Sequence, residues 1–137
     1  MTNGAVKKAL LIDDSDIDLF IQKRFLEVYE FSSQLEMYNS ANEALNSLLT
    51  GEENNAPEVI FLDLNMPEAD GFTFLKDFNE LPENIRKKSK IVVLTSSESN
   101  IDRDFVLSFN NVIHFITKPL KHSDIEELKN IFKNSPK

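Results

Sequence analysis

Short apolar runs alternate along the chain with segments in which apolar residues recur at helical spacing. The runs occupy residues 9–12, 35–38, 59–62, 90–95 and 112–116. All but the second are nearly continuous and lack polar alternation, which is typical of strands covered on both faces. The second is weaker because Glu36 interrupts it. The pattern predicts five strands, most of them buried.

A helix is predicted after each strand. Ser15 with Asp18, Ser40 with Glu43 and Ser123 with Glu126 have the spacing of capping boxes, and Pro82 is expected to end the third helix. The apolar positions are Ile17, Phe20, Ile21, Phe25 and Val28; Ala44, Leu45, Leu48 and Leu49; Phe72, Leu75, Phe78 and Leu81; Ile101, Phe105, Leu107 and Phe109; and Ile125, Leu128, Ile131 and Phe132.

A strand and a helix repeated five times indicate an α/β fold, because parallel strands need crossover connections and helical crossovers cover both faces of the sheet. We predict a five-stranded parallel sheet in the order 2-1-3-4-5, the flavodoxin-like (βα)5 arrangement, because this order places the first and third strands side by side at the switch point. We expect one domain over residues 1–137, with a core at about 8–133 and no output domain.

The amino-acid composition argues against several kinds of partner and location. The formal net charge is −8, so we expect no nucleic-acid partner. There is no Cys, no apolar run long enough to span a membrane and no apolar signal segment at the start, so we expect a cytoplasmic protein without a membrane partner. The only local basic cluster, Arg86-Lys87-Lys88 with Lys90, is interpreted as a solvated loop.

Polar residues follow the predicted strands at the end where each strand finishes. Asp13 and Asp14 follow the first, Asp63 the third, Thr95 closes the fourth and Lys118 follows the fifth. The carboxyl ends of parallel strands share one edge of a sheet, so these five residues should converge there. Each of them alone would be an ordinary loop or cap residue; together they predict a site.

Three neighbouring carboxylates repel one another and require a cation or a shared proton. Only oxygen ligands are available at this edge, so Mg²⁺ is a better match than Zn²⁺. Because Mg²⁺ also binds phosphate oxygens, the site suggests phosphoryl chemistry with Asp63 as nucleophile. Lys118 would neutralise the transferred group, and the Thr95 hydroxyl would donate a hydrogen bond to it.

Over nearly its whole length, the chain resembles the receiver domains of two-component response regulators. The resemblance rests on Ile12-Asp13-Asp14-Ser15, Leu62-Asp63-Leu64-Asn65-Met66-Pro67 with Asp70-Gly71, Leu94-Thr95-Ser96, and Phe115-Ile116-Thr117-Lys118-Pro119. It implies that Asp63 is the phosphoacceptor and that Mg²⁺ (or Mn²⁺) is the cofactor. Asp14 then matches the direct metal ligand, Asp13 its neighbour that often acts through water, and Asn65 the position whose backbone carbonyl completes the metal site.

The resemblance also assigns a switch and partners. Thr95 and Phe115 match the switch pair, and Lys118 matches the phosphate-contacting lysine, whose bond to Pro119 is typically cis in similar proteins. It implies a phosphoryl donor that is a histidine kinase or a histidine phosphotransfer protein. The output would pass to an unknown protein, or onward as a phosphoryl group, through the face formed by the fourth predicted helix, the fifth strand and the last helix.

The resemblance also bears on the lifetime of the phosphoryl group and on the turn before the fifth strand. Asn65 and Ser97 lie where side chains of similar proteins tune the lifetime of the phosphoryl group. Before Phe115 the chain has Phe109-Asn110-Asn111-Val112 in place of the usual Gly-Ala, which affects the turn into the fifth strand and not the chemistry.

Other classes share parts of this pattern. A phosphatase of the haloacid-dehalogenase type would have a second Asp two residues after the nucleophile, where this chain has Asn65. A flavodoxin would have a Ser/Thr-rich phosphate loop where this chain has Asp13-Asp14-Ser15-Asp16. A degenerate receiver acting only as an interaction module would not be expected to keep Asp63, Thr95 and Lys118. We therefore expect a signalling phosphoacceptor and not a turnover enzyme.

Overall fold

The protein is described as a computed structural model covering residues 6–51, 56–64, 71–96 and 100–134, with side chains excepted at 100–102 and 134. Its sheet has five parallel strands in the order β2-β1-β3-β4-β5, which confirms the predicted topology. The strands are β1 (Val6–Ile12), β2 (Ser32–Tyr38), β3 (Val59–Asp63), β4 (Lys90–Thr95) and β5 (Val112–Thr117).

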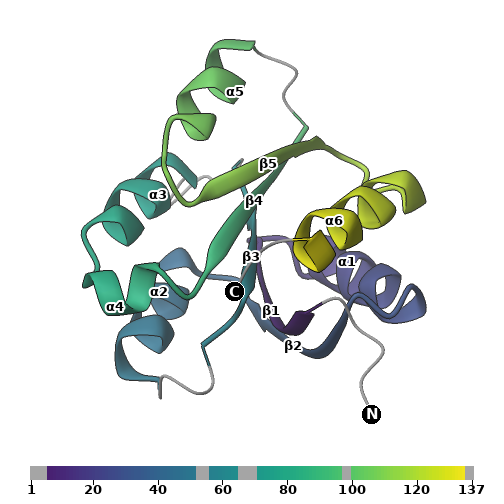
Figure 1. Ribbon diagram of the computed structural model, residues 1–137, viewed down its shortest axis with the longest axis horizontal. Coiled ribbons are helices and arrows are strands. Elements are labelled where there is room, and N and C mark those ends of the chain that lie inside the picture. The colour runs from purple at the N-terminus through teal and green to yellow at the C-terminus, as the bar shows by residue number, and fades with distance from the viewer. Residues whose placement is uncertain (1–5, 52–55, 65–70, 97–99, 135–137) are drawn as a thin grey trace.

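Helices cover both faces of the sheet (Figure 1). They are α1 (Asp16–Val28), α2 (Ala41–Thr50), α3 (Gly71–Asn79), α4 (Glu83–Arg86), α5 (Asn100–Leu107) and α6 (His122–Asn134). One core lies between the sheet and α2, α3 and α5, and a second lies between the sheet and α1 and α6. Within the described ranges, no helix is long and apolar enough to cross a membrane.

The predicted helix starts are partly confirmed. The Ser15 and Ser40 hydroxyls accept hydrogen bonds from the backbone N–H of Asp18 and Glu43. The third prediction is wrong, because α6 begins at His122 and the Asp124 carboxylate accepts the N–H of Lys121. Asp124 is the third residue of the helix, and its carboxylate accepts the N–H of the residue before the helix, as the N3 side chain does in a capping box.

The apolar residues from which the first helix was predicted are mostly not the residues that α1 buries. Ile17, Phe20, Ile21 and Val28 are between 57% and 73% exposed. The side chains that α1 buries are Leu19, Gln22 and Leu26. These residues are also at helical spacing, so the helix has two apolar stripes and periodicity alone does not choose between them. An apolar face of α1 is therefore left in contact with solvent.

Side-chain hydrogen bonds connect the segment before β5 to the segment before β4. The one-turn helix α4 follows Pro82 and ends at Arg86, the first residue of the basic segment predicted as a loop. The Asn111 side-chain amide donates to the carbonyls of Arg86 at 2.7 Å and Ser89 at 3.0 Å, and the Ser89 hydroxyl donates to the Pro57 carbonyl at 2.7 Å. Asn111 thus connects the turn into β5 to the segment before β4, where the sequence departs from the receiver pattern.

Candidate functional site

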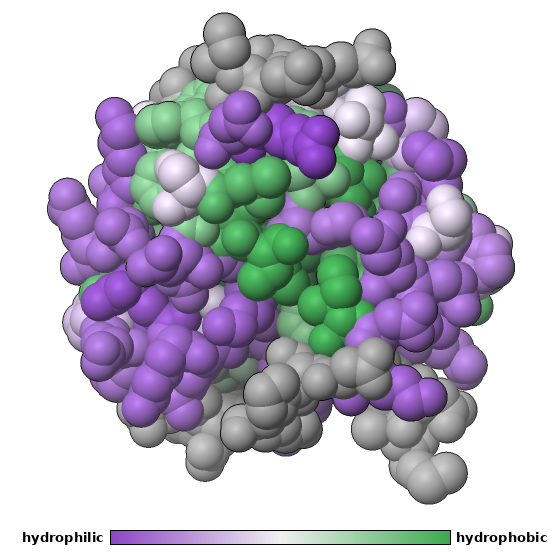
Figure 2. Space-filling model, turned by 45° about the horizontal axis from the view of Figure 1, so that its top comes forward, coloured by the Kyte–Doolittle hydropathy of each residue, from purple (hydrophilic) through white to green (hydrophobic). Residues whose placement is uncertain are grey.

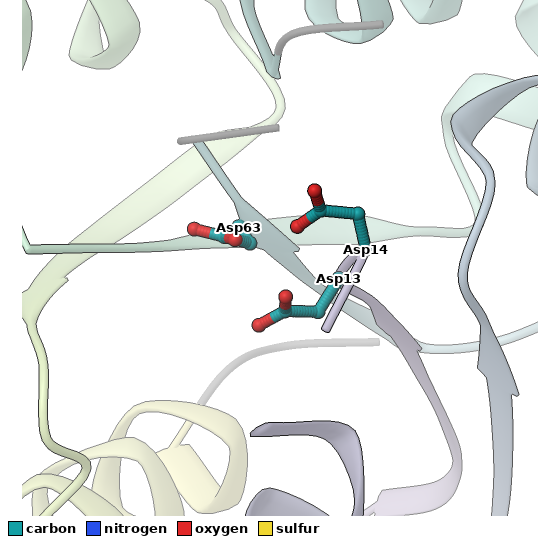
Figure 3. A group of neighbouring side chains, drawn as sticks. All are labelled: Asp13, Asp14 and Asp63. Carbon is teal, nitrogen blue, oxygen red and sulfur yellow. The ribbon is translucent and has the colours of Figure 1, made fainter. Parts of the chain in front are cut away.

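Three carboxylates meet where β1 and β3 end. The two strands are neighbours with Ile12 opposite Leu62, so the residues that follow, Asp13 and Asp63, lie next to each other. One carboxylate oxygen from each of Asp13, Asp14 and Asp63 lies within 4.8 Å of the others. Figure 3 shows the three side chains as neighbours. Asp13 and Asp63 are buried and Asp14 is exposed. The predicted acidic cluster is present.

The Asp13 carboxylate is held by three donors. Its Oδ1 accepts from the backbone N–H of Ser15 at 3.0 Å, and its Oδ2 accepts from Gln22 Nε2 at 3.2 Å and from Lys118 Nζ at 3.0 Å. A carboxylate oxygen offers about two lone-pair sites, so Oδ2 is already fully engaged. This leaves Asp13 less able than the exposed Asp14 to bind a metal ion directly.

Lys118 brings a positive charge into the cluster. Its backbone N–H donates to the Thr95 carbonyl at 2.7 Å, and its bond to Pro119 is cis. The ammonium nitrogen lies 3.0 Å from Asp13, 3.1 Å from Asp18 and 3.5 Å from Asp63. Burial alone would lower the pKa of Lys118, but the hydrogen bond to Asp13, the charges of Asp63 and Asp13, and the hydrogen bond to Asp18 outweigh burial and raise it. Lys118 is therefore a cation at neutral pH.

Thr95 and Phe115 lie on adjacent strands and face the same side of the sheet. Leu94 is opposite Asp63, so Thr95 is one residue beyond the phosphoacceptor position on the neighbouring strand. Val93 is opposite Phe115, and residues two apart in a strand share a face. Thr95 is fully buried, whereas Phe115 is half-buried and packs against the core beneath α2, α3 and α5. Their positions suit a coupled pair.

Two residues of the site were not anticipated. Asp18 was predicted only as part of a capping box, but its carboxylate accepts a hydrogen bond from Lys118 Nζ. Gln22, one helical turn later, is buried and donates to Asp13. Their i, i+4 spacing behind the acidic corner is the signal that could have indicated a shared face. The predicted metal-site position Asn65, like Ser97, lies outside the described residues.

The acidic cluster offers only oxygen ligands to a divalent cation. Each of the three aspartates offers a carboxylate oxygen, and they come from two neighbouring strand ends. Hard cations such as Mg²⁺ prefer oxygen ligands and are commonly bound by one or two carboxylates. The residues present therefore fit Mg²⁺.

The fold and the site together define a class. This is a doubly wound α/β protein with its acidic site at the switch point of the sheet, where β1 and β3 lie side by side. The comparison with known families identifies the class further: a family profile described as "Response regulator receiver domain" matches residues 9–130. The chain belongs to the response regulator receiver domain family.

Individual relatives agree with this assignment. The chain is 30% identical over 126 residues to the probable methanogenesis regulatory protein FilR2 of Methanothrix harundinacea, covering 88% of this chain and 79% of that protein. It is 30% identical over 131 residues to response regulator Rcp1 of Synechocystis, covering 93% and 82%. A two-component response regulator from Cytophaga hutchinsonii superposes with a TM-score of 0.85 at 27% identity, covering 94% and 98%.

Family membership settles the general function. The chain is a receiver domain of two-component signalling, a family whose general role is to accept a phosphoryl group and whose acidic pocket binds Mg²⁺. The cluster of Asp13, Asp14 and Asp63 is compatible with that pocket.

Proposed function

We propose that this chain accepts a phosphoryl group on Asp63 from a phosphohistidine of a histidine kinase or a histidine phosphotransfer protein. One observation carries the proposal. Asp63 is buried at the end of β3, with the carboxylates of Asp13 and Asp14 within 4.8 Å and the Lys118 ammonium at 3.5 Å. A nucleophile surrounded by oxygen ligands and a fixed cation suits phosphoryl transfer, which depends mainly on positioning and charge stabilisation.

In the proposed step, an oxygen of the Asp63 carboxylate attacks the phosphorus atom. A P–O bond forms, the P–N bond of the donor breaks, and the imidazole nitrogen keeps the electron pair and takes up a proton. Lys118 stabilises the negative charge on the transferred group. Bound Mg²⁺ (or Mn²⁺), held by Asp13, Asp14, Asp63 and the backbone carbonyl of Asn65, would neutralise further charge on the phosphoryl oxygens.

The output is proposed to pass through Thr95 and Phe115. The Thr95 hydroxyl would donate to the phosphoryl group, and Phe115 would occupy the space that Thr95 leaves. The face affected is α5–β5–α6, where Phe105 and Leu107 are exposed. Figure 2 shows apolar side chains gathered in a band on this side of the molecule. We propose that a downstream protein binds this face in the cytoplasm. In this proposal the chain acts as a signalling protein and not as a turnover enzyme.

The phosphoryl donor is proposed to bind along the exposed apolar face of α1. A protein donor must bring its imidazole to Asp63, so it has to contact the edge of the sheet that carries the site. Ile17, Phe20 and Ile21 extend from that edge. A pocket of about 290 Å³ between α1 and Pro119 is lined by Ile21 and by Lys118 of the site. An apolar helical surface on the donor would match this face.

The test of the proposal is phosphorylation by a small donor. Wild-type protein incubated with acetyl phosphate and Mg²⁺ is expected to gain one acid-labile, base-sensitive phosphoryl group by intact mass spectrometry, and the Asp63→Asn protein none. Asp77→Asn, which changes an exposed aspartate of α3, is the matched control and should be phosphorylated normally. Phosphate on the Asp63→Asn protein would overturn the assignment of the nucleophile.

A phosphatase of the dehalogenase type is distinguished by turnover. The proposed signalling protein should show no steady turnover of p-nitrophenyl phosphate. Continued linear release by the wild type, abolished in Asp63→Asn, would instead identify a turnover enzyme.

A further inference from the structure

Lys118 binds three carboxylates, and the phosphoacceptor is the most distant of them. Its ammonium nitrogen donates hydrogen bonds to Asp13 and Asp18 at 3.0 and 3.1 Å, whereas Asp63 lies at 3.5 Å. An ammonium group has three N–H donors. In this resting arrangement, two of the three closest contacts of Lys118 are made to carboxylates that do not react.

The two hydrogen-bonded partners differ in how firmly they are held. The Asp13 side chain is 1% exposed and also accepts hydrogen bonds from Ser15 and Gln22. The Asp18 side chain is 43% exposed, in the first turn of α1. Separating a buried ion pair leaves an uncompensated charge, whereas a solvent-exposed carboxylate that loses its partner is hydrated. Asp18 is thus the partner that Lys118 can release most easily.

A phosphoryl group on Asp63 changes the competition for Lys118. It adds negative charge and acceptor oxygens next to an ammonium group that already lies 3.5 Å from Asp63. Beside its hydrogen bonds to Asp13 and Asp18, Lys118 has one further N–H for these oxygens, and it can donate a second hydrogen bond to them only by giving up one of those two. Asp18 also contributes a negative charge that repels the new group directly. Both effects have the same sign: Asp18 opposes binding of the phosphoryl group.

We propose that Asp18 is the counter-ion that Lys118 exchanges for the phosphoryl group, and that Asp18 thereby limits how tightly this site holds that group. The inference rests on the proposed function, since it assumes that Asp63 is the phosphoacceptor. Asp18 is a positioning residue that acts through Lys118, and it makes the resting state more favourable relative to the phosphorylated state.

The experiment measures binding of beryllofluoride, which mimics a phosphoryl group on a carboxylate, in the presence of Mg²⁺. Asp18→Asn keeps the shape of the side chain and removes its charge, and Asp18→Ser is a second neutral variant. Both are expected to bind beryllofluoride about 2- to 5-fold more tightly than wild type, the upper part of the range for one partly exposed ion pair. Titration monitored by NMR gives the dissociation constants, and circular dichroism confirms folding.

Asp16→Asn is the matched control. Asp16 carries the same charge in the same helical turn, is exposed, and lies near Asn39 at 3.5 Å, so its removal has a similar effect on the helix dipole. Its affinity for beryllofluoride should stay within about twofold of wild type, because no lysine contact is lost.

A second titration separates this role from a structural one. Binding of Mg²⁺ alone, measured calorimetrically, should be unchanged or weaker in Asp18→Asn, because removing a nearby negative charge does not favour a cation. Tighter beryllofluoride binding without tighter Mg²⁺ binding supports the exchange. Unchanged or weaker beryllofluoride binding in both neutral variants overturns it. If wild type itself binds no beryllofluoride, the proposed function fails, which is a different result.

Discussion

At the start of α3, Gly71 packs so closely against the end of β3 that there is no room for a side chain. A Cβ atom at this position would lie 2.8 Å from the Cα of Leu64 and 3.1 Å from the carbonyl oxygen of Asp63. Gly71 does not have a positive φ, so a left-handed backbone is not the reason for glycine here. The requirement is for close approach of two backbones beside the phosphoacceptor.

Gly71→Ala is therefore expected to destabilise the protein by about 1–3 kcal/mol, the usual cost of overpacking a rigid site. Urea unfolding monitored by circular dichroism measures the change. Because the added methyl group also presses on the peptide of Asp63, phosphorylation by acetyl phosphate should slow.

The control for Gly71→Ala is Lys76→Ala, at an exposed position in the same helix. It should change the free energy of unfolding by no more than about 0.5 kcal/mol. Equal stability of Gly71→Ala and wild type would show that the two backbones can separate without cost.

The two sides of helix α1 differ in their contacts. Its inner side buries Leu19 and Leu26 against the sheet and places Gln22 on Asp13. Its outer side exposes apolar residues that contribute nothing to the core. Exposed apolar area of this kind commonly marks a surface that binds another protein. The position of this surface next to Lys118 is the reason to assign it to the phosphoryl donor.

Phe20→Ser is expected to slow phosphotransfer from a protein donor about tenfold, because a large apolar contact is lost at the interface. Phosphorylation by acetyl phosphate should not change, since this small donor does not need the helix. The measurement uses a histidine kinase that phosphorylates the wild-type chain and compares initial rates with both donors.

Leu49→Ser is the control for the α1 surface. Leu49 is 52% exposed and belongs to α2, on the other face of the sheet. It should affect neither donor. A similar loss of rate with Leu49→Ser, or an equal loss with acetyl phosphate in Phe20→Ser, would contradict a donor surface on α1.

For the molecule as a whole, the acidic cluster should link folding to Mg²⁺. A ligand that binds only the folded protein stabilises it, by about 2.7 kcal/mol at a concentration 100 times the dissociation constant. The cluster forms only when β1 and β3 are paired. Thermal unfolding should therefore shift to higher temperature as Mg²⁺ is added, and EDTA should reverse the shift.

Asp14→Asn should reduce this Mg²⁺ effect, and NaCl at equal ionic strength should not reproduce it. Asp16→Asn, outside the cluster, should keep the full response. A melting temperature that responds equally to NaCl and MgCl₂ would show that the cluster does not bind the metal selectively.

The sequence predicted the topology because buried parallel strands leave a strong signal, and the topology then dictated which strand-end residues converge. Asp13, Asp63 and Lys118 could be found in this way. The spacing of Asp18 and Gln22 could indicate that they share a face of α1, but not that this face is turned toward the site, since that depends on the rotation of α1 about its axis. That rotation is fixed by packing against the sheet and not by the spacing of apolar residues, of which α1 has two sets.

The hydrogen bonds of Asn111 make the amino end of the sheet more rigid than its carboxyl end. Near the amino end of β5, the Asn111 side chain and the Ser89 hydroxyl bind three carbonyl groups, two in the segment before β4 and one in the segment before β3. At the carboxyl end, the strands lead into charged side chains whose ion pairs can be rearranged. For the proposed switch, this means that β5 would pivot about an anchored end. Small displacements at Thr95 would then turn into motion of Phe115 and α5, while the opposite end of the sheet stays in place.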